Sequence, residues 1–353
     1  MKILIIKFRN IGDILLATPL ISNLKSHFPQ SNIDFATNLE CLPIIERNPN
    51  ISNLIFFDRE KIKNLNIFSR FKEELSLILT IRRKRYDLVL NLTEGERGAI
   101  YAISSRAERR MGLKLKNNFY NYFKIFTNYL NDDQSIHAAE KDLRFLNLLD
   151  KEIVSYNLEV FWNKVIEKAL LKKYNNLFSD KYVIVHPVSR WMFKCWDNAK
   201  MARAIDHIKL ARGCEVIITA SKDDNEIQRV KQIISLTKSN PINLSGLLNI
   251  EELTIFLSRA SLFFGIDSAP MHIAAACGTP IVSLFGASYP VNWGPWVNHK
   301  NKFKNVNGVQ FNGKHYVISN MNHEIFYDGG IKKTIGMEQI EYKTVENILD
   351  KIL

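Results

Sequence analysis

The first segment suited to catalysis follows the apolar run KILIIKF at residues 2–8. It reads Arg9-Asn10-Ile11-Gly12-Asp13, and Gly12 permits both a sharp turn and a close approach of a ligand to the backbone. A carboxylate at the carboxyl end of a strand is placed as a general base would be. Asp13 is therefore the candidate base, although an aspartate that only caps a helix gives the same pattern.

A second segment, His186 to Asp197, follows another apolar run and gathers polar and cationic groups in one predicted loop: Ser189, Arg190 and Lys194. A sugar nucleotide leaves as a diphosphate, so negative charge grows on it in the transition state. Cationic and hydroxyl donors directed at that charge are the expected catalysts. The three aromatic residues of the segment are better explained by packing, and Asp197 is expected to cap the next helix.

A third segment, Gly265 to Pro280, has the layout strand, tight loop, helix, and then a glycine and a proline that end the helix. Free N–H groups at such a helix start bind anions. We expect Asp267 to accept a hydrogen bond from a sugar hydroxyl or to orient the loop, because it lies too close to the anion to bind it directly. A capping aspartate and a packed histidine are the structural alternative. The candidate donor-binding residues here are Asp267, Ser268, Ala269 and His272, and Gly12 of the first segment is a further one.

Two more loops follow predicted strands. Residues 221–226 are acidic and suit ribose hydroxyls, and in residues 243–248 the backbone of Gly246 and Leu247 is placed to read an adenine edge. Both also fit ordinary strand-to-helix loops. The candidate acceptor-binding residues lie in the N-terminal half and are Arg9, Asn10, Glu96 and Arg97.

Sequence patterns for several other chemistries are absent. There is no GxxxxGK[ST], no GxGxxG, no HExxH and no Asp-x-Asp. The four cysteines lie far apart without a CxxC pair, which favours neither a zinc site nor a disulfide framework. We therefore expect no cofactor and no metal, with cationic side chains and helix N–H groups meeting the charge instead.

The elements that must position these segments are short β-branched runs alternating with helical patterns. Nearly continuous apolar strands between helices imply a parallel sheet covered on both faces. The pattern restarts near residue 182, so we predict an α/β fold of two doubly wound, Rossmann-like domains facing a central cleft. The predicted strands are 2–8, 33–37, 54–57, 87–92, 182–187, 214–219, 242–244, 262–266 and 281–285, and the predicted helices of the second half are 197–211, 223–236, 250–259 and 270–277.

The expected domain boundary lies in the polar, helical stretch at about 150–180. We assign residues 1–160 to a first domain and residues 175–336 to a second domain. The last segment, 337–353, is expected to form a helix, and one arrangement open to it is to pack back on the N-terminal domain.

The composition and charge of the chain limit the kinds of partner that it can bind. The 353 residues are 46% hydrophobic, and no apolar run approaches the roughly 20 residues that a bilayer span needs. Charges interrupt the apolar start, unlike a signal peptide, so a cytoplasmic protein is expected. The net charge is +12, and Arg59 to Lys124 alone carries 16 basic against 7 acidic residues. This basic stretch suits a phosphorylated membrane surface or nucleic acid, although a lysine-rich genome and solvated helix faces would also produce it.

Together the three segments resemble glycosyltransferase family 9, the ADP-heptose:lipopolysaccharide heptosyltransferases. IGDILLATPLI resembles the first signature of that family, and HPVSRWMFKCWD and FFGIDSAPMHIAAACGTPIVSLFGASYPVNWGPW resemble its two C-terminal signatures. The last two are most similar to the branch that adds the third heptose of the inner core. The sequence Ser-Ala-Pro after Asp267, where some members have Thr-Gly-Leu, supports that branch.

The resemblance implies a GT-B fold with acceptor on the N-terminal domain and donor on the C-terminal one. It matches Asp13 to the base, and Lys194 and Ser189 to the contacts with the donor phosphates. It matches Asp267, Ser268, Ala269 and His272 to the donor loop. Glu226 is the better match for the ribose-binding acid, and Asp224 stays open.

The predicted function is an inverting, metal-independent transfer of L-glycero-D-manno-heptose from ADP-heptose to the lipopolysaccharide inner core. The basic stretch would give peripheral contact with the cytoplasmic face of the inner membrane. The alternatives are a GT-B enzyme using another nucleotide sugar in surface polysaccharide synthesis, a sugar-nucleotide epimerase, a catalytically inactive homologue, and a nucleic-acid-binding protein. No helix-turn-helix, zinc-finger or RNP pattern supports the last, so no nucleic-acid partner is expected.

Overall fold

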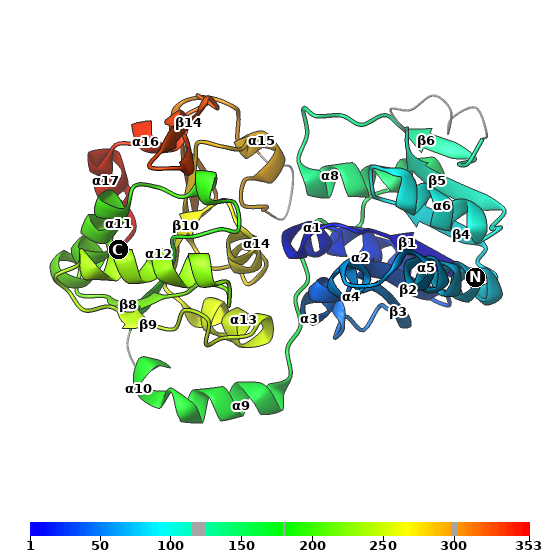
Figure 1. Cartoon of the computed structure of the whole chain (residues 1–353), viewed down its shortest axis with the longest axis horizontal. Coiled ribbons are helices and arrows are strands. Elements are labelled where there is room, and N and C mark those ends of the chain that lie inside the picture. Colours follow the sequence, from blue (N-terminus) through cyan, green and yellow to red (C-terminus); the bar gives the residue numbers. More distant parts are fainter. Residues whose placement is uncertain (115–123, 179–180, 298–301) are drawn as a thin grey trace. The chain divides into compact units, whose positions relative to one another are not determined.

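The computed structural model describes residues 1–114, 124–178, 181–297 and 302–353. The chain divides into two compact units, Met1–Phe161 (unit 1) and Trp162–Leu353 (unit 2) (Figure 1). Each unit is built on its own largely parallel sheet. The predicted α/β class, with two doubly wound, Rossmann-like domains, is confirmed by these two sheets.

The sheet of unit 1 has the strand order β3-β2-β1-β4-β5-β6, and all its paired strands run parallel. The order reverses at β1 and β4, so their carboxyl ends lie side by side at a topological switch point, where open α/β sheets bind ligands. The strands are β1 (Lys2–Ile6), β2 (Asn32–Asn38), β3 (Asn53–Phe57), β4 (Leu88–Asn91), β5 (Arg109–Leu113) and β6 (Asn128–Leu130).

Helices connect these strands, and side-chain caps mark where several begin. Asp58 accepts a hydrogen bond from the N–H of Lys61 at the start of α4, and Asn66 does the same for Ser69 at the start of α5. The helical elements of unit 1 are α1 (Ile11–Leu16), α2 (Thr18–His27), η1 (Leu39–Cys41), α3 (Leu42–Ile45), α4 (Arg59–Lys63), α5 (Ile67–Lys84), α6 (Glu96–Ser104), α8 (Ala138–Leu143) and η2 (Arg144–Leu149).

The sheet of unit 2 has the order β12-β13-β11-β10-β7-β8-β9, parallel except for the β12–β13 pair. Its switch point lies between β7 and β10. Every residue of β7, β10 and β11 is buried, which requires cover on both faces. The strands are β7 (Tyr182–His186), β8 (Glu215–Ile218), β9 (Ile242–Asn243), β10 (Leu262–Ile266), β11 (Ile281–Phe285), β12 (Gly308–Asn312) and β13 (His315–Ser319), with a separate hairpin of β14 (Ile325–Asp328) and β15 (Ile331–Thr334).

The helices predicted for the second half are all present, with ends shifted by a few residues. The stretch predicted as 197–211 is an α-helix that continues as a π-helix. The helical elements of unit 2 are α9 (Lys164–Lys173), α10 (Asn175–Phe178), η3 (Met192–Lys194), α11 (Asn198–Asp206), η4 (His207–Ala211), α12 (Asp224–Ser235), α13 (Ile250–Arg259), α14 (Ala269–Ala276), α15 (Pro290–Trp293), α16 (Ile335–Gln339) and α17 (Tyr342–Ile352).

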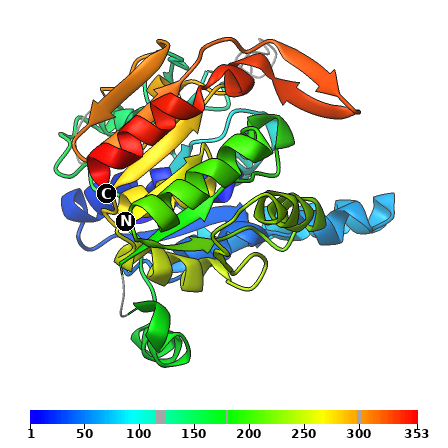
Figure 2. The same ribbon diagram turned by 90° about the vertical axis from the view of Figure 1, so that its left-hand side faces the viewer.

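The C-terminal segment corrects one expectation. Instead of one helix it forms α16 and α17, and Val345 and Leu349 of α17 are fully buried in the core of unit 2. Figure 2 shows α17 in red beside α11 in green, over the strands of that sheet. The helix considered for packing back on the N-terminal domain therefore belongs to unit 2.

No helix within the described stretches of the chain is both long and apolar enough to cross a bilayer. Part of the basic segment 59–124 falls on residues 115–123, which lie outside the described residues.

Candidate functional site

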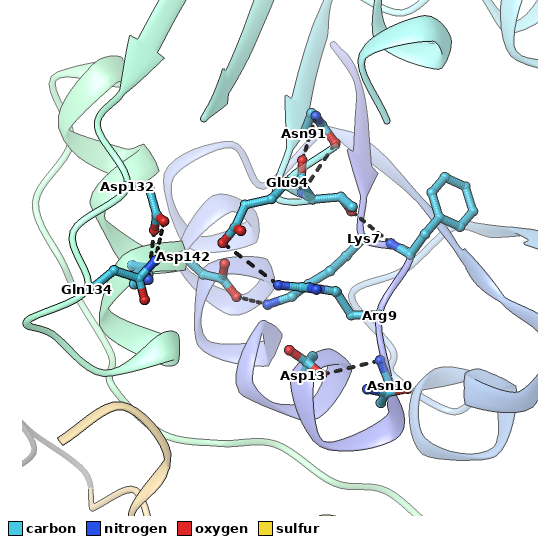
Figure 3. Close-up of polar contacts among 12 residues, drawn as sticks. Lys7, Arg9, Asn10, Asp13, Asn91, Glu94, Asp132, Gln134 and Asp142 are labelled. Carbon is cyan, nitrogen blue, oxygen red and sulfur yellow. Dashed lines mark hydrogen bonds and ion pairs between the residues drawn. The ribbon is translucent and has the colours of Figure 1, made fainter. Parts of the chain in front are cut away.

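Asp13 lies in the first turn of α1, directly after the loop that follows β1 (Figure 3). Its carboxylate accepts a hydrogen bond from the backbone N–H of Asn10 at 3.2 Å. The residue is partly exposed, whereas its neighbour Gly12 is buried. Asp13 is therefore not the N-cap residue of α1, which is Asn10, but its carboxylate bonds back to that residue, and Asp13 stays partly exposed.

A buried ion pair that the sequence analysis did not identify lies close to Asp13. The Nζ of Lys7, just after β1, contacts Oδ2 of Asp142 on α8, and both side chains are less than a tenth exposed (Figure 3). Burial raises the pKa of Asp142 to about 6; Lys7 opposes this rise, and the charge of Asp13 adds to it. The negative charge of Asp13 therefore helps to hold the pKa of this buried carboxyl above its usual value.

The candidate acceptor residues follow β1 and β4, whose last residues, Ile6 and Asn91, are partners in the sheet. Arg9 is within 3.8 Å of Glu94, but both side chains are about two-fifths exposed, so this ion pair holds neither firmly. Glu96 is exposed at the start of α6. The neighbouring ends of β1 and β4 thus bring these groups, with Asn10, to the same edge of the sheet.

Arg97 is held differently. Its guanidinium lies 4.1 Å from the ring centre of Phe57 and 3.3 Å from a carboxylate oxygen of Glu74. The packing against β3 and α5 gives this arginine a structural role within unit 1, and it is the weakest of the four acceptor candidates.

In unit 2, Lys194 and Asp267 meet although they are 73 residues apart. Lys194 ends η3, which follows β7, and Asp267 follows β10, the strand beside β7 in the sheet. The Nζ of Lys194 lies 2.6 Å from Oδ2 of Asp267, and the two side chains are 21% and 7% exposed. The fold therefore joins the second and third predicted segments in one polar cluster.

Two further side chains contact the Asp267 carboxylate. The hydroxyl of Ser288, after β11, donates to Oδ2 at 2.6 Å, and Nε2 of His272 lies 4.0 Å from Oδ1. Burial alone would raise the pKa of Asp267, but Lys194, His272 and the hydrogen bonds from Lys194 and Ser288 more than offset it and hold the pKa below its usual value. Asp267 is therefore a buried, ionised anchor for the groups around it.

The start of α14 presents backbone N–H groups beside this cluster. Ser268 is the N-cap residue, but its hydroxyl donates to the carbonyl of Ile266 and does not cap the helix. Pro270 has no N–H, and no acceptor for the N–H of Ala269 is found among the described residues. An unused N–H at a helix start is suited to an anion.

The loop after β7 is braced from several sides. The Ser189 hydroxyl accepts a hydrogen bond from the N–H of Trp191 at 3.2 Å, and Arg190 is exposed. Thr334 of β15 donates to the carbonyl of Phe193 at 2.8 Å, so the β14–β15 hairpin supports this loop. The role expected for Asp197 is confirmed: its carboxylate accepts from the N–H of Lys200 and caps α11.

The two weaker loops of the sequence analysis are neighbours. Gly246 adopts a φ of +71°, and its N–H donates to the carbonyl of Ala220 at 3.1 Å. Glu226 is only 4% exposed, and its Oε2 accepts from the N–H of Ser221 at 2.9 Å. Asp224 and Leu247 are exposed. Glu226 is thus held at a defined place beside Gly246, whereas Asp224 is not.

Among the residues the structure describes, no three His, Cys, Asp or Glu side chains gather as a metal-binding group. Ser288 is the residue of the unit 2 cluster that the sequence analysis did not single out. The available signal was its place in the loop after the buried strand β11, at the sheet edge that carries the other loops.

Comparison with known proteins agrees with these observations. Residues 75–316 match the model of glycosyltransferase family 9 (heptosyltransferase). The chain is 32% identical over 316 residues to lipopolysaccharide heptosyltransferase 3 of Escherichia coli strain K12, covering 89% of this chain and 88% of that protein.

Two solved structures share the fold. Heptosyltransferase II of E. coli superposes with a TM-score of 0.75 at 18% identity, covering all of this chain and 98% of that one. The heptosyltransferase WaaC of E. coli, solved with ADP, superposes with a TM-score of 0.73 at 14% identity over the whole of both chains. At these identities the likeness speaks for the GT-B fold alone.

Proposed function

Because the chain belongs to glycosyltransferase family 9, the heptosyltransferases, we propose that it transfers L-glycero-D-manno-heptose from ADP-heptose to the inner core of lipopolysaccharide. The similarity to lipopolysaccharide heptosyltransferase 3 favours the third inner-core heptose as the sugar that is added. The observation that carries the proposal is the buried cluster in which Lys194 contacts Asp267 at 2.6 Å beside the start of α14.

In the proposed reaction the donor binds at the carboxyl ends of the strands of unit 2. The ammonium of Lys194, the hydroxyl of Ser189 and the N–H of Ala269 meet the diphosphate. Glu226 accepts hydrogen bonds from the ribose, and the backbone of Gly246 and Leu247 lies beside the adenine. His272 and Asp267 contact the heptose or hold the loop that does; Ser268 and Arg190 complete the donor set.

The chemical step is a single displacement. Asp13 removes the proton of the acceptor hydroxyl as its oxygen attacks the anomeric carbon, and ADP leaves from the opposite face, so the configuration at that carbon inverts. Negative charge on the departing ADP is stabilised by Lys194 and the helix start, without a metal. Arg9, Asn10, Glu96 and Arg97 form the acceptor side.

The domain assignment follows from the same proposal. Unit 1 binds the acceptor and unit 2 binds the donor, and the bound sugar nucleotide must be kept from reacting with water. The basic stretch gives the protein a peripheral contact with the cytoplasmic face of the inner membrane.

The test is a transfer assay with purified protein, heptose-truncated lipopolysaccharide acceptors, and a donor series of ADP-heptose, UDP-sugars and GDP-sugars. Mass spectrometry should show one heptose added from ADP-heptose, and NMR should show the anomeric configuration opposite to that of the donor. Efficient transfer from a UDP- or GDP-sugar instead would establish another nucleotide-sugar enzyme. Unchanged rates after prolonged chelation would support the metal-independent step, and loss of activity restored by one divalent ion would contradict it.

A further inference from the structure

Helix α5 carries a row of large apolar side chains that unit 1 does not cover. Phe68, Phe71, Leu75 and Leu79 recur at a spacing of three or four residues and therefore share one helix face. Phe68 is 85% exposed and Phe71 is 70% exposed. A different face of the same helix packs inward, because Ile81 is fully buried and Leu77 and Ile78 contact the core of unit 1.

The charges around this row are of one sign. Lys72, Arg82 and Arg83 are exposed on α5 itself. The two acidic residues of the helix are engaged elsewhere: Glu73 pairs with Lys61 at 2.6 Å, and Glu74 contacts Arg97. The exposed apolar row is therefore bordered by cations whose charge the helix does not neutralise.

The C-terminal end of the row meets a surface cavity of about 630 Å³. Leu79 contributes to its lining, and so do two arginines from the end of α5, Arg85 after it, and Arg106 from the turn after α6. Among the lining residues the acidic ones are Asp87 and Glu108, so arginine outnumbers carboxylate there. Such a cavity suits a phosphate group.

We propose that α5 is a membrane-docking helix: it lies in the plane of an anionic phospholipid bilayer, with Phe68, Phe71 and Leu75 entering the headgroup boundary and the arginine-lined cavity holding lipid phosphate. Exposed aromatic and aliphatic side chains flanked by lysine and arginine are the composition of interfacial helices. A protein partner is the less suitable occupant, since the exposed charges of α5 beside the row are cationic and arginine outnumbers carboxylate in the cavity. The inference rests on the proposed function in one respect: an acceptor anchored in a membrane explains why the enzyme docks there.

The test measures binding of the full chain to vesicles. One set contains equal parts phosphatidylglycerol and phosphatidylcholine, and the other contains phosphatidylcholine alone. The doubly substituted variant Phe68→Ser/Phe71→Ser should lower the partition coefficient for the anionic vesicles at least about tenfold, because two aromatic side chains no longer leave water. The matched control Phe311→Ser/Tyr327→Ser, at positions 69% and 71% exposed in unit 2, should stay within about twofold of the parent protein.

Replacing Arg82 and Arg83 by serine should weaken binding to the anionic vesicles and leave binding to the neutral ones unchanged. Parent protein that does not bind anionic vesicles, or a Phe68→Ser/Phe71→Ser variant that binds like the parent, would overturn the proposal. A dimer in sedimentation velocity that this variant dissolves would also overturn it, since the row would then join two copies of the chain.

Transfer to a soluble, deacylated core acceptor separates this inference from the proposed function. The Phe68→Ser/Phe71→Ser variant should retain the rate of the parent protein on that acceptor and lose rate only on acceptor presented in vesicles. If the parent protein transfers no heptose to either acceptor, the proposed function fails, whereas vesicle binding still decides the role of α5.

Discussion

Replacing Lys194 with methionine should destabilise unit 2 by about 2–3 kcal/mol, and a second change, Asp267→Asn, should restore most of that loss. The ammonium and carboxylate are 2.6 Å apart, and their side chains are 21% and 7% exposed. At an effective dielectric constant near 20, two unit charges at that distance attract by about 6 kcal/mol. Desolvation of both groups offsets more than half of this attraction, which leaves the stated net value.

The pH dependence of this effect has a definite sign. The pKa of Asp267 is lowered in the folded protein, so its ionised form stabilises the fold above the unfolded pKa of about 4, and this stabilisation is lost as pH falls. In Lys194→Met, the rise that burial causes in the pKa of Asp267 is no longer outweighed by the lysine, so this pKa rises. The difference between the parent protein and Lys194→Met should therefore be largest near pH 7 and shrink toward pH 4.

Urea unfolding followed by tryptophan fluorescence is the appropriate assay, because all five tryptophans belong to unit 2 and two of them, Trp196 and Trp296, are almost fully buried. Lys168→Met, at an exposed lysine of α9, serves as the matched control and should change stability by less than about 0.5 kcal/mol. Single variants whose effects simply add in the double variant would show that the two side chains do not interact, and the geometry of the cluster would then be wrong.

Asp13→Asn should lower kcat by about 10²–10⁴-fold, because an amide is not a base. The thermal unfolding temperature should change little, since the amide oxygen still accepts the hydrogen bond from Asn10. A fully active variant would remove the assignment of Asp13 as the base. The raised pKa of Asp142, about 6, means that the folded protein holds this proton more tightly than the unfolded chain. The stabilisation that this proton gives is complete below about pH 4 and is lost as pH rises through 6. Unfolding followed by far-UV circular dichroism should therefore show that the free energy of unfolding of the parent protein falls by about 1 kcal/mol relative to Asp142→Asn between pH 5 and 8. A pH-independent difference would contradict that titration. Gly98→Ala should lower the free energy of unfolding by about 1–3 kcal/mol, because a Cβ there would lie 2.2 Å from Oδ1 of Asn91. A urea titration that shows no loss of stability would mean that α6 shifts freely against β4.

The elements that the sequence predicted most clearly are those buried on both faces. β7, β10 and β11 are continuous apolar runs, and every residue in them is buried. β5 begins with two arginines, and β12 is largely exposed at the sheet edge. Neither the alternation of apolar and polar residues nor the composition distinguishes such strands from a loop. They form strands because they pair with the neighbouring strand of the sheet.

Within the candidate site, the sequence identified groups at the carboxyl ends of strands and missed groups that reach them from elsewhere. Asp267 and Lys194 each lie in a segment that follows an apolar run, and this position predicts them. Asp142 lies in the helix AAEKDL, where it reads as one more surface charge, and Lys7 stands in an otherwise apolar segment. Their pairing across 135 residues is a tertiary contact with no local signature.

The contact between Lys194 and Asp267 also bears on how one lysine can serve a diphosphate. An ammonium group carries three N–H donors, and the short contact with Asp267 uses one of them. Because Asp267 is itself ionised, the pair has no net charge, and the attraction of the site for an anion must come from the direction of the remaining donors and from the N–H of Ala269. Arginine at position 194 would keep the charge but change that direction, so Lys194→Arg should bind ADP within about tenfold of the parent protein while losing most of kcat. A variant that keeps both the ADP affinity and the kcat of the parent protein would show that charge alone, and not orientation, is what Lys194 contributes.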